Sequence, residues 1–112
     1  MISDTTIAQI LRFIADRDWG QFHTPGNLAK SVSIEAGELL ECFQWTNEPR
    51  DGDVEHVCEE LADVMIYCLQ LADLLGVDPD AIIREKMHKN AQKYPVATSK
   101  GNSKKASPTT QA

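Results

Sequence analysis

The sequence predicts an all-α protein, a small four-helix bundle that assembles into oligomers. Three observations support this fold class. Apolar residues recur every three or four positions in four separate segments. Glycine, proline and other turn-forming residues separate these segments. No stretch alternates apolar and polar residues in the way that is typical of a β-strand.

Two helices are expected in the first half of the chain. The first covers residues 5–17, with Asp4 or Thr5 as its N-cap. Residues 18–26 follow, a segment rich in turn formers. The second helix is expected over residues 27–45, where apolar side chains share one face.

Two further helices are expected in the second half. The third runs from residue 54 to residue 75 and stops at Gly76, because glycine suits the left-handed conformation that ends many helices. The fourth begins with Asp78 as N-cap and Pro79 at the first helical position, and continues to residue 93.

The predicted helical domain covers residues 1–95, and a polar tail covers residues 96–112. From Ala97 onward the tail contains no large apolar side chain, so we expect it to be disordered or only loosely held. The third helix has apolar residues over a wide part of its surface and therefore needs neighbours on several sides. Four short helices bury little core by themselves, which predicts a homo-oligomer.

Composition and charge argue against several classes of protein. The formal net charge of −6 argues against nonspecific binding to nucleic acid. The sequence has neither a basic and apolar leader nor a run of roughly 20 apolar residues that would cross a bilayer, so we expect a cytoplasmic protein without membrane contact. The three cysteines form no C-x-x-C pair and are expected to be buried free thiols. A zinc site made from His56 and Cys58 would lack a second pair of ligands.

Two pairs of acidic residues suggest a metal site. On a helical wheel, Glu35 falls within the apolar stripe of the second helix and Glu38 lies at its edge. Glu60, Asp63 and Tyr67 follow one another along the flank of the apolar stripe of the third helix. A carboxylate on an apolar face is costly unless it is paired, and four carboxylates on two packed helices repel unless a cation lies between them. Oxygen ligands of this kind suit Mg²⁺.

Each acidic pair, taken alone, is more often part of a solvated helix surface. The same holds for the excess of acidic residues between Glu35 and Asp63 and the excess of basic residues from Arg84 to Lys105. This asymmetry also fits the two halves of a site for metal and phosphate. A calcium loop is not supported, because no twelve-residue EF-hand pattern is present.

Several motifs also match a known family. Glu35-Ala-Gly-Glu38, followed by Glu59-Glu60-Leu-Ala-Asp63, is similar to an E-x-x-E … E-x-x-D signature, and residues 86–95 are similar to a K-x-x-x-N-x-x-K/R-Y-P ending. Both motifs are those of the MazG-like all-α nucleoside triphosphate pyrophosphohydrolases, which the sequence resembles over residues 7–95. Three further segments resemble the dCTP pyrophosphatase branch of that family: residues 17–28, Phe43-Gln44-Trp45 and residues 63–67.

The resemblance implies an enzyme that uses Mg²⁺, with Mn²⁺ as a substitute, to cleave the α–β phosphoanhydride of a nucleoside triphosphate. The products would be the monophosphate and pyrophosphate, in a house-cleaning role for the nucleotide pool, and the branch makes dCTP or a related deoxynucleotide the expected substrate. The implied metal ligands are Glu35, Glu38, Glu60 and Asp63, of which Glu35 and Glu38 are the expected catalytic residues. The resemblance further implies a dimer or a dimer of dimers.

The expected substrate-binding residues fall into two groups. The resemblance places the base and sugar against Trp19, Gly20, Gln21, Phe22, His23, Trp45 and Tyr67. The position that matches a base-contacting histidine of the branch is occupied by Ile10. Lys86 and Lys93, by their charge, and Asn90, by its amide, are candidates for binding phosphates. The simpler explanation for the lysines is that a helix C-terminus favours cations.

Two other interpretations stay open from the sequence. One is a non-catalytic helical oligomer with an interaction or regulatory role, in which the acids are surface charge or a metal site without turnover. The other is a relative within the same superfamily that acts on phosphoribosyl-ATP. The sequence also leaves open which acid accepts the proton of the attacking water.

Overall fold

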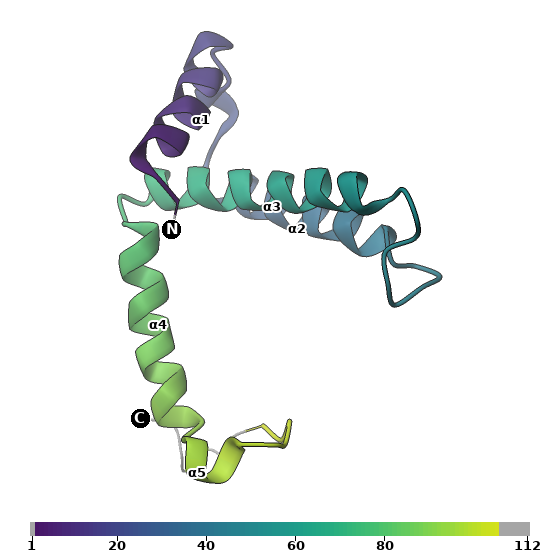
Figure 1. Ribbon diagram of the computed structural model, residues 1–112. Helices are drawn as coiled ribbons and strands as arrows, with labels where there is room; N and C mark the ends of the chain where they lie inside the picture. The colour runs from purple at the N-terminus through teal and green to yellow at the C-terminus, as the bar shows by residue number, and fades with distance from the viewer. Residues whose placement is uncertain (1, 106–112) are drawn as a thin grey trace. The chain divides into compact units, whose positions relative to one another are not determined.

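Residues 2–105, described here from a computed structural model, form five α-helices and one short 3₁₀ helix (Figure 1), and contain no β-strand. The elements in chain order are α1 (Asp4–Asp16), the 3₁₀ helix η1 (Gly20–Phe22), α2 (Pro25–Glu41), α3 (Val54–Leu74), α4 (Pro79–Lys93) and α5 (Val96–Ser99). The predicted all-α class is therefore confirmed. Within these residues, none of the helices combines the length and the apolar character needed to cross a membrane.

The chain divides into two units, with the division between Val77 and Asp78. The first unit contains α1, η1, α2 and α3, and the second contains α4 and α5. Three of the four predicted long helices, α1, α2 and α3, therefore belong to the first unit, and the fourth, α4, belongs to the second. Because none of the α4 residues is buried, this helix contributes little to a core within one chain.

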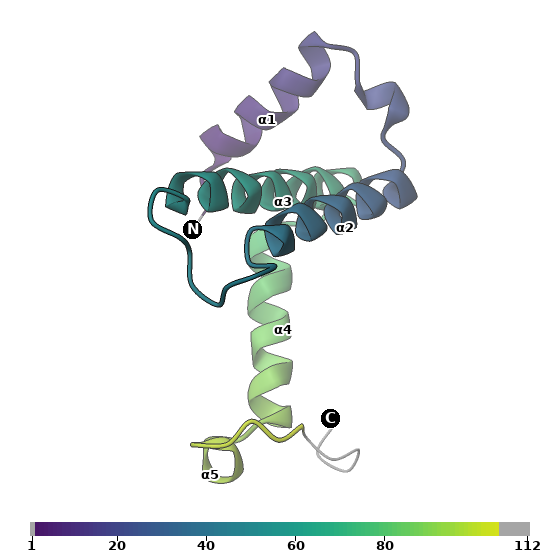
Figure 2. The same cartoon turned by 90° about the vertical axis from the view of Figure 1, so that its right-hand side faces the viewer.

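Helices α2 and α3 are the closely packed pair of the first unit (Figure 2). The buried side chains of the described residues are Leu28 on α2 and Gln70 and Ala72 on α3. Helix α1 makes fewer contacts, and makes them with α3. The side-by-side packing of α2 and α3 brings their acidic residues toward one another.

Side-chain caps determine where the first two long helices begin. The Ser3 hydroxyl accepts a hydrogen bond of 3.1 Å from the backbone N–H of Thr6, so Ser3 is the N-cap of α1 and the predicted caps are wrong. Thr24 caps α2 in the same way, accepting from the N–H of Asn27 at 3.1 Å, and Pro25 takes the first helical position. Helix α2 therefore begins two residues before its predicted start.

The end of α2 differs from the prediction, whereas the end of α3 agrees with it. Helix α2 stops at Glu41, and residues 42–45 form turns, so Trp45 lies outside the helix. After α3, Gly76 has φ +71°, and the N–H of Val77 donates to the carbonyl of Ala72 at 3.0 Å. This is the Schellman arrangement, in which a left-handed residue lets the last carbonyls find donors.

Two smaller predictions need correction. The helical turn α5 lies within the tail that was expected to be disordered, while residues 106–112 lie outside the described residues and the domain boundary at residue 95 stays a prediction. Cys58 and Cys68 are exposed and only Cys42 is partly covered, so the prediction of three buried thiols is wrong.

Candidate functional site

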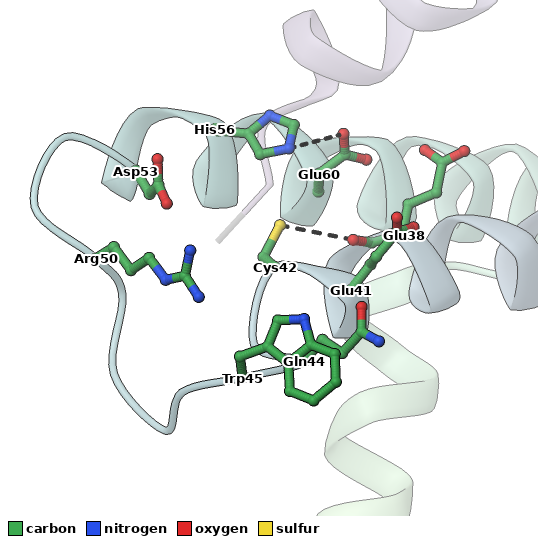
Figure 3. A pocket seen from close by; sticks show the side chains of 9 residues that line it. All are labelled: Glu38, Glu41, Cys42, Gln44, Trp45, Arg50, Asp53, His56 and Glu60. Carbon is green, nitrogen blue, oxygen red and sulfur yellow. Dashed lines mark hydrogen bonds and ion pairs between the residues drawn. The ribbon is translucent and has the colours of Figure 1, made fainter.

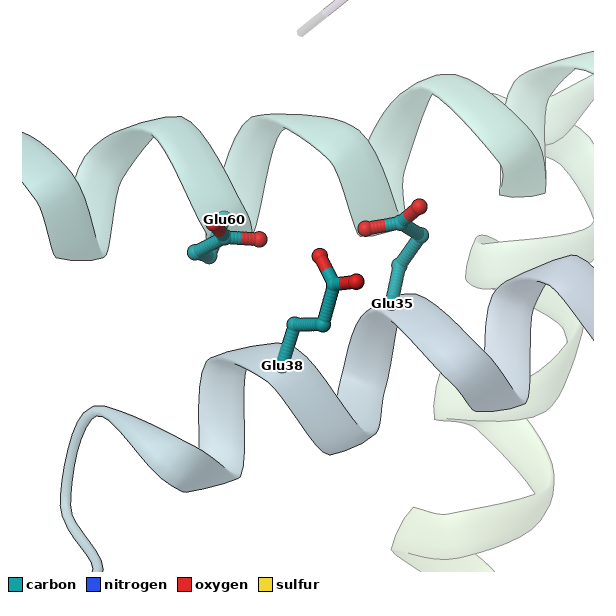
Figure 4. Close-up of side chains that lie close together, drawn as sticks. All are labelled: Glu35, Glu38 and Glu60. Carbon is teal, nitrogen blue, oxygen red and sulfur yellow. The ribbon is translucent and has the colours of Figure 1, made fainter.

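Three carboxylates meet between α2 and α3. Glu35 and Glu38 on α2 and Glu60 on α3 each offer one oxygen, and these oxygens lie within 4.8 Å of one another (Figure 4). Glu38 lies between the other two side chains. We call this group the acidic cluster. A divalent cation could bind all three residues at once.

Asp63, the fourth predicted ligand, lies beside the acidic cluster. It is one helical turn after Glu60, and its negative charge contributes to raising the pKa of Glu35. Its carboxylate is not among the three that approach one another within 4.8 Å. The structure therefore brings three of the four acids together and leaves Asp63 at the border of the cluster.

The electrostatics of the acidic cluster favour a bound cation. Burial, followed by the hydrogen bond and charge of Glu38, raises the pKa of Glu35 to about 6. Burial is also the main cause that raises the pKa of Glu60, whose side chain is 15% exposed. One oxygen of Glu35 and one of Glu60, Oε2 in both, are buried without a hydrogen-bond partner. Buried polar atoms normally have partners, so these two oxygens fit the ligand set of a hard cation such as Mg²⁺.

A polar pocket of about 370 Å³ lies on one side of the acidic cluster, and we call it the acidic pocket (Figure 3). It is lined by Glu38, Glu41, Cys42, Gln44, Trp45, Arg50, Asp53, His56 and Glu60. Arg50 and His56 are the lining residues that can carry positive charge. The Arg50 guanidinium points into the pocket, and Nε2 of His56 lies 3.8 Å from Oε1 of Glu60.

The acidic pocket contains residues that the sequence did not assign to the site. His56 was considered from the sequence as a partner of Cys58 in a zinc site, although its i, i+4 spacing to Glu60 was a usable signal. Nothing in the local sequence pattern pointed to Arg50, which lies in the loop between α2 and α3. Burial raises the pKa of the Cys42 thiol, and the thiol donates to the carbonyl of Glu38 at 3.6 Å.

A larger, mostly apolar pocket of about 600 Å³ lies between α1, the η1 region and α3, and we call it the apolar pocket. Its wall includes Ile10, Trp19, His23, Asp63, Tyr67 and Gln70. The Trp19 ring is held edge-on to the Phe13 ring, with ring centroids 5.8 Å apart. Its backbone N–H donates to the carbonyl of Ile14 at 3.1 Å. Trp19 is thus a positioned wall of the pocket.

The predicted substrate-binding residues are divided between several places. Trp19, His23 and Tyr67 line the apolar pocket together. Gly20, Gln21 and Phe22 form η1 and shape the loop: the Gln21 amide donates to the Asp18 carbonyl at 2.9 Å, and the Asn27 amide donates to the Phe22 carbonyl at 3.0 Å.

Trp45 does not line the apolar pocket, and the predicted basic residues belong to the other unit. Within one chain Trp45 lines the acidic pocket, not the pocket of Trp19, and it is 79% exposed. Lys86, Asn90 and Lys93 share one face of α4, which belongs to the second unit. Their part in binding phosphate stays a prediction.

Comparison with known proteins decides the family. Residues 30–108 match the model of the MazG-like family, and this segment contains all four predicted acids. The chain belongs to the MazG-like family.

Several relatives of this MazG-like chain can be named. Proteins called dCTP pyrophosphatase 1 are 44% identical in Mus musculus and 38% identical in Homo sapiens, covering 80% and 83% of the chain. The chain spans only 57% and 59% of the length of these two relatives. The crystal structure of a pyrophosphatase from Archaeoglobus fulgidus is similar with a TM-score of 0.73 and 42% identity, over 82% of this chain and 91% of that one.

Proposed function

We propose that this MazG-like chain is a Mg²⁺-dependent nucleoside triphosphate pyrophosphohydrolase that produces a monophosphate and pyrophosphate. The observation that carries the proposal is that the acidic cluster opens into one pocket, while Asp63 at its border lines the other. Glu38 and Glu60 line the acidic pocket, whereas Asp63 lines the apolar pocket. A nucleotide with its base in the apolar pocket would have its phosphates at the carboxylates. The names of the relatives make dCTP or a related deoxynucleotide the first candidate.

Glu35, Glu38, Glu60 and Asp63 are the residues that would hold Mg²⁺, or Mn²⁺ in its place. The two buried Oε2 atoms without partners support this assignment. When bound, the cation supplies charge neutralisation at the phosphates and Lewis acidity. Glu38 is exposed and lies between the other two carboxylates, which supports it as the group that would accept the proton of the attacking water.

Turnover on defined substrates tests this function. Each deoxynucleoside triphosphate, and phosphoribosyl-ATP, would be incubated with the protein and Mg²⁺ while pyrophosphate and orthophosphate are measured separately. We expect pyrophosphate release, fastest with dCTP or a close analogue. Activity restricted to phosphoribosyl-ATP would favour the other superfamily function, and release of orthophosphate alone would contradict α–β cleavage. No turnover with any substrate would favour a non-catalytic helical module.

Arg50 is expected to bind the pyrophosphate part of the substrate. The acidic pocket holds four carboxylates against Arg50 and His56, so a phosphate would enter only with a divalent cation and would then meet the guanidinium. Arg50→Ala should raise KM and weaken inhibition by Mg-pyrophosphate about 10-fold, the size of one lost charge-assisted hydrogen bond, with a smaller change in kcat. Steady-state kinetics measures both. Arg12→Ala, which removes an 85% exposed guanidinium on α1, is the matched control and should change neither.

Metal binding should depend on pH through the acidic cluster. Because the pKa of Glu35 is raised to about 6, its carboxyl group gains a proton below that pH in the metal-free protein. Because this pKa is higher in the folded protein than in the unfolded chain, the metal-free fold loses stability as the pH rises from the unfolded-state pKa of Glu35 to about 6. We therefore expect Mg²⁺ affinity, measured by calorimetry, to fall as the pH drops below 6. Added Mg²⁺ should raise the melting temperature more at pH 7.5 than at pH 5, and an equal rise at both values would contradict the site.

A homo-oligomer is the expected assembly, as a dimer or a dimer of dimers. On α2 the side chains of Ile34 and Leu40 are 62% and 71% exposed, and on α3 Leu61 and Met65 are 46% and 43% exposed. Apolar residues on both helices of the packed pair would be covered if the α2–α3 pair of a second copy packed against them. The cytoplasmic location predicted from the sequence stays a prediction.

Light scattering after size-exclusion chromatography tests the assembly. The wild-type protein should give a multiple of the 12.4 kDa chain mass. Leu40→Asp should shift the distribution toward smaller species, because it places a charge on the apolar surface of α2. Val96→Asp, at a 76% exposed position on α5, is the control. A wild-type protein that stays at the mass of one chain at high concentration would refute the oligomer.

A further inference from the structure

Gln70 has an unusual environment for an amide side chain. It lies on α3 and is only 6% exposed. Among the residues that the structure describes, it is the one polar residue that is buried. Its carbonyl oxygen Oε1 is buried and accepts no hydrogen bond. Since buried polar atoms are normally paired, the amide is available for a partner that enters from outside.

The place of Gln70 on α3 indicates where such a partner would come from. Asp63, Tyr67 and Gln70 follow one another at helical spacing, so their side chains share one face of α3. All three line the apolar pocket. Ile10, on the wall formed by α1, offers no hydrogen bond to a ligand in this pocket. Gln70 is therefore a buried polar group on a mostly apolar wall.

We propose that Gln70 is a specificity-determining residue that hydrogen-bonds the edge of the nucleobase in the apolar pocket. The inference rests on the proposed function, because it takes this pocket to be the nucleoside side of the site. A primary amide presents one acceptor and two donors. It pairs with a base edge that carries an acceptor beside a donor, as the ring nitrogen N3 and the 4-amino group of cytosine do. A site that buries such an amide rejects bases that leave it unpaired.

Gln70→Leu is the test, with Gln92→Leu as the matched control. Leucine keeps much of the side-chain volume and removes the amide. Gln92 lies exposed on α4 and undergoes the same chemical change. Gln70→Leu should lower kcat/KM for the preferred deoxynucleoside triphosphate about 10- to 100-fold and reduce its preference over the other three. Inhibition by Mg-pyrophosphate should not change, because pyrophosphate is expected in the acidic pocket.

Stability separates this role from a structural one. If the amide is unpartnered in the free protein, Gln70→Leu should raise the melting temperature by several degrees, because an apolar group replaces a buried unsatisfied oxygen. An amide that holds the fold together would instead lower it. If Gln70→Leu fails to fold, Gln70→Met gives the same comparison with a more flexible side chain.

A binding measurement keeps the inference separate from the proposed activity. Calorimetry with dCMP should show affinity at least about 10-fold weaker for Gln70→Leu than for wild type, and this readout does not require turnover. If wild type hydrolyses no triphosphate but dCMP binding still depends on Gln70, the proposed function fails and the inference stands. If wild type hydrolyses dCTP and Gln70→Leu keeps the base preference and dCMP affinity of wild type, the inference is overturned.

Discussion

Glu38→Gln is expected to reduce pyrophosphate release about 10³-fold while leaving the helical circular dichroism spectrum unchanged. The side chain lies between Glu35 and Glu60, with all three carboxylates offering oxygens within 4.8 Å of one another. A glutamine amide has nearly the same shape but carries no charge for a cation and cannot accept a proton. Loss of one preorganised electrostatic group of an active site typically costs 10²- to 10³-fold, and Glu38 is expected to have two roles. Turnover at saturating Mg²⁺ measures the effect.

Glu55→Gln is the matched control for that change. Glu55 is exposed in the first turn of α3 and lines neither pocket, so its replacement should leave turnover unchanged. Asp63→Asn tests the border of the acidic cluster in the same assay. If Asp63 completes the ligand set, this variant should lose most of its turnover. Full activity of Glu38→Gln would show that the acidic cluster is not the catalytic centre.

Leu28→Ala should be the most destabilising single truncation in the first unit, at about 2–5 kcal/mol. Leu28 is 1% exposed and lies on α2, in the pair of helices that forms the core. Few side chains in residues 2–105 are buried, so the neighbours of Leu28 have little means to fill the cavity that the change leaves. Urea unfolding at one fixed protein concentration measures the loss, because an oligomer changes its apparent stability with concentration.

Val96→Ala provides the comparison for Leu28→Ala. Val96 is 76% exposed on α5, and its truncation should change the free energy of unfolding by less than about 0.5 kcal/mol. Similar small losses for both variants would mean that the core of the assembled protein lies elsewhere than between α2 and α3.

Local signals predicted the boundary between α3 and α4 well, but they missed the side-chain caps Ser3 and Thr24 that begin α1 and α2. Gly76 and the Asp78-Pro79 pair gave the end of α3 and the start of α4 correctly, because both depend on backbone preferences of single residues. The end of α2 was placed too late. Phe43 and Trp45 continue an apolar spacing that looks the same in a helix and in the tight turns that follow Glu41.

The acidic residues of the candidate site could be predicted from the sequence. Only some of its other residues could be. A carboxylate at position 35 inside an apolar stripe is a signal that needs no tertiary structure, because its cost follows from helical periodicity alone. Arg50 could not be found in this way, since it lies in a loop and its direction depends on the path of that loop. Gln70 looked like an ordinary polar residue until its burial and its unpartnered oxygen were visible.

By itself the sequence determined the all-α class, the two acidic pairs on successive helices and the motifs of the MazG-like family. These properties are local, because they depend on the spacing of residues along one helix or one motif. Only the tertiary structure decided that Glu35, Glu38 and Glu60 meet while Asp63 borders them, and that Trp19 and Trp45 line different pockets. Distances between helices depend on how their side chains interlock and on the course of the connecting loops, and helical periodicity specifies neither.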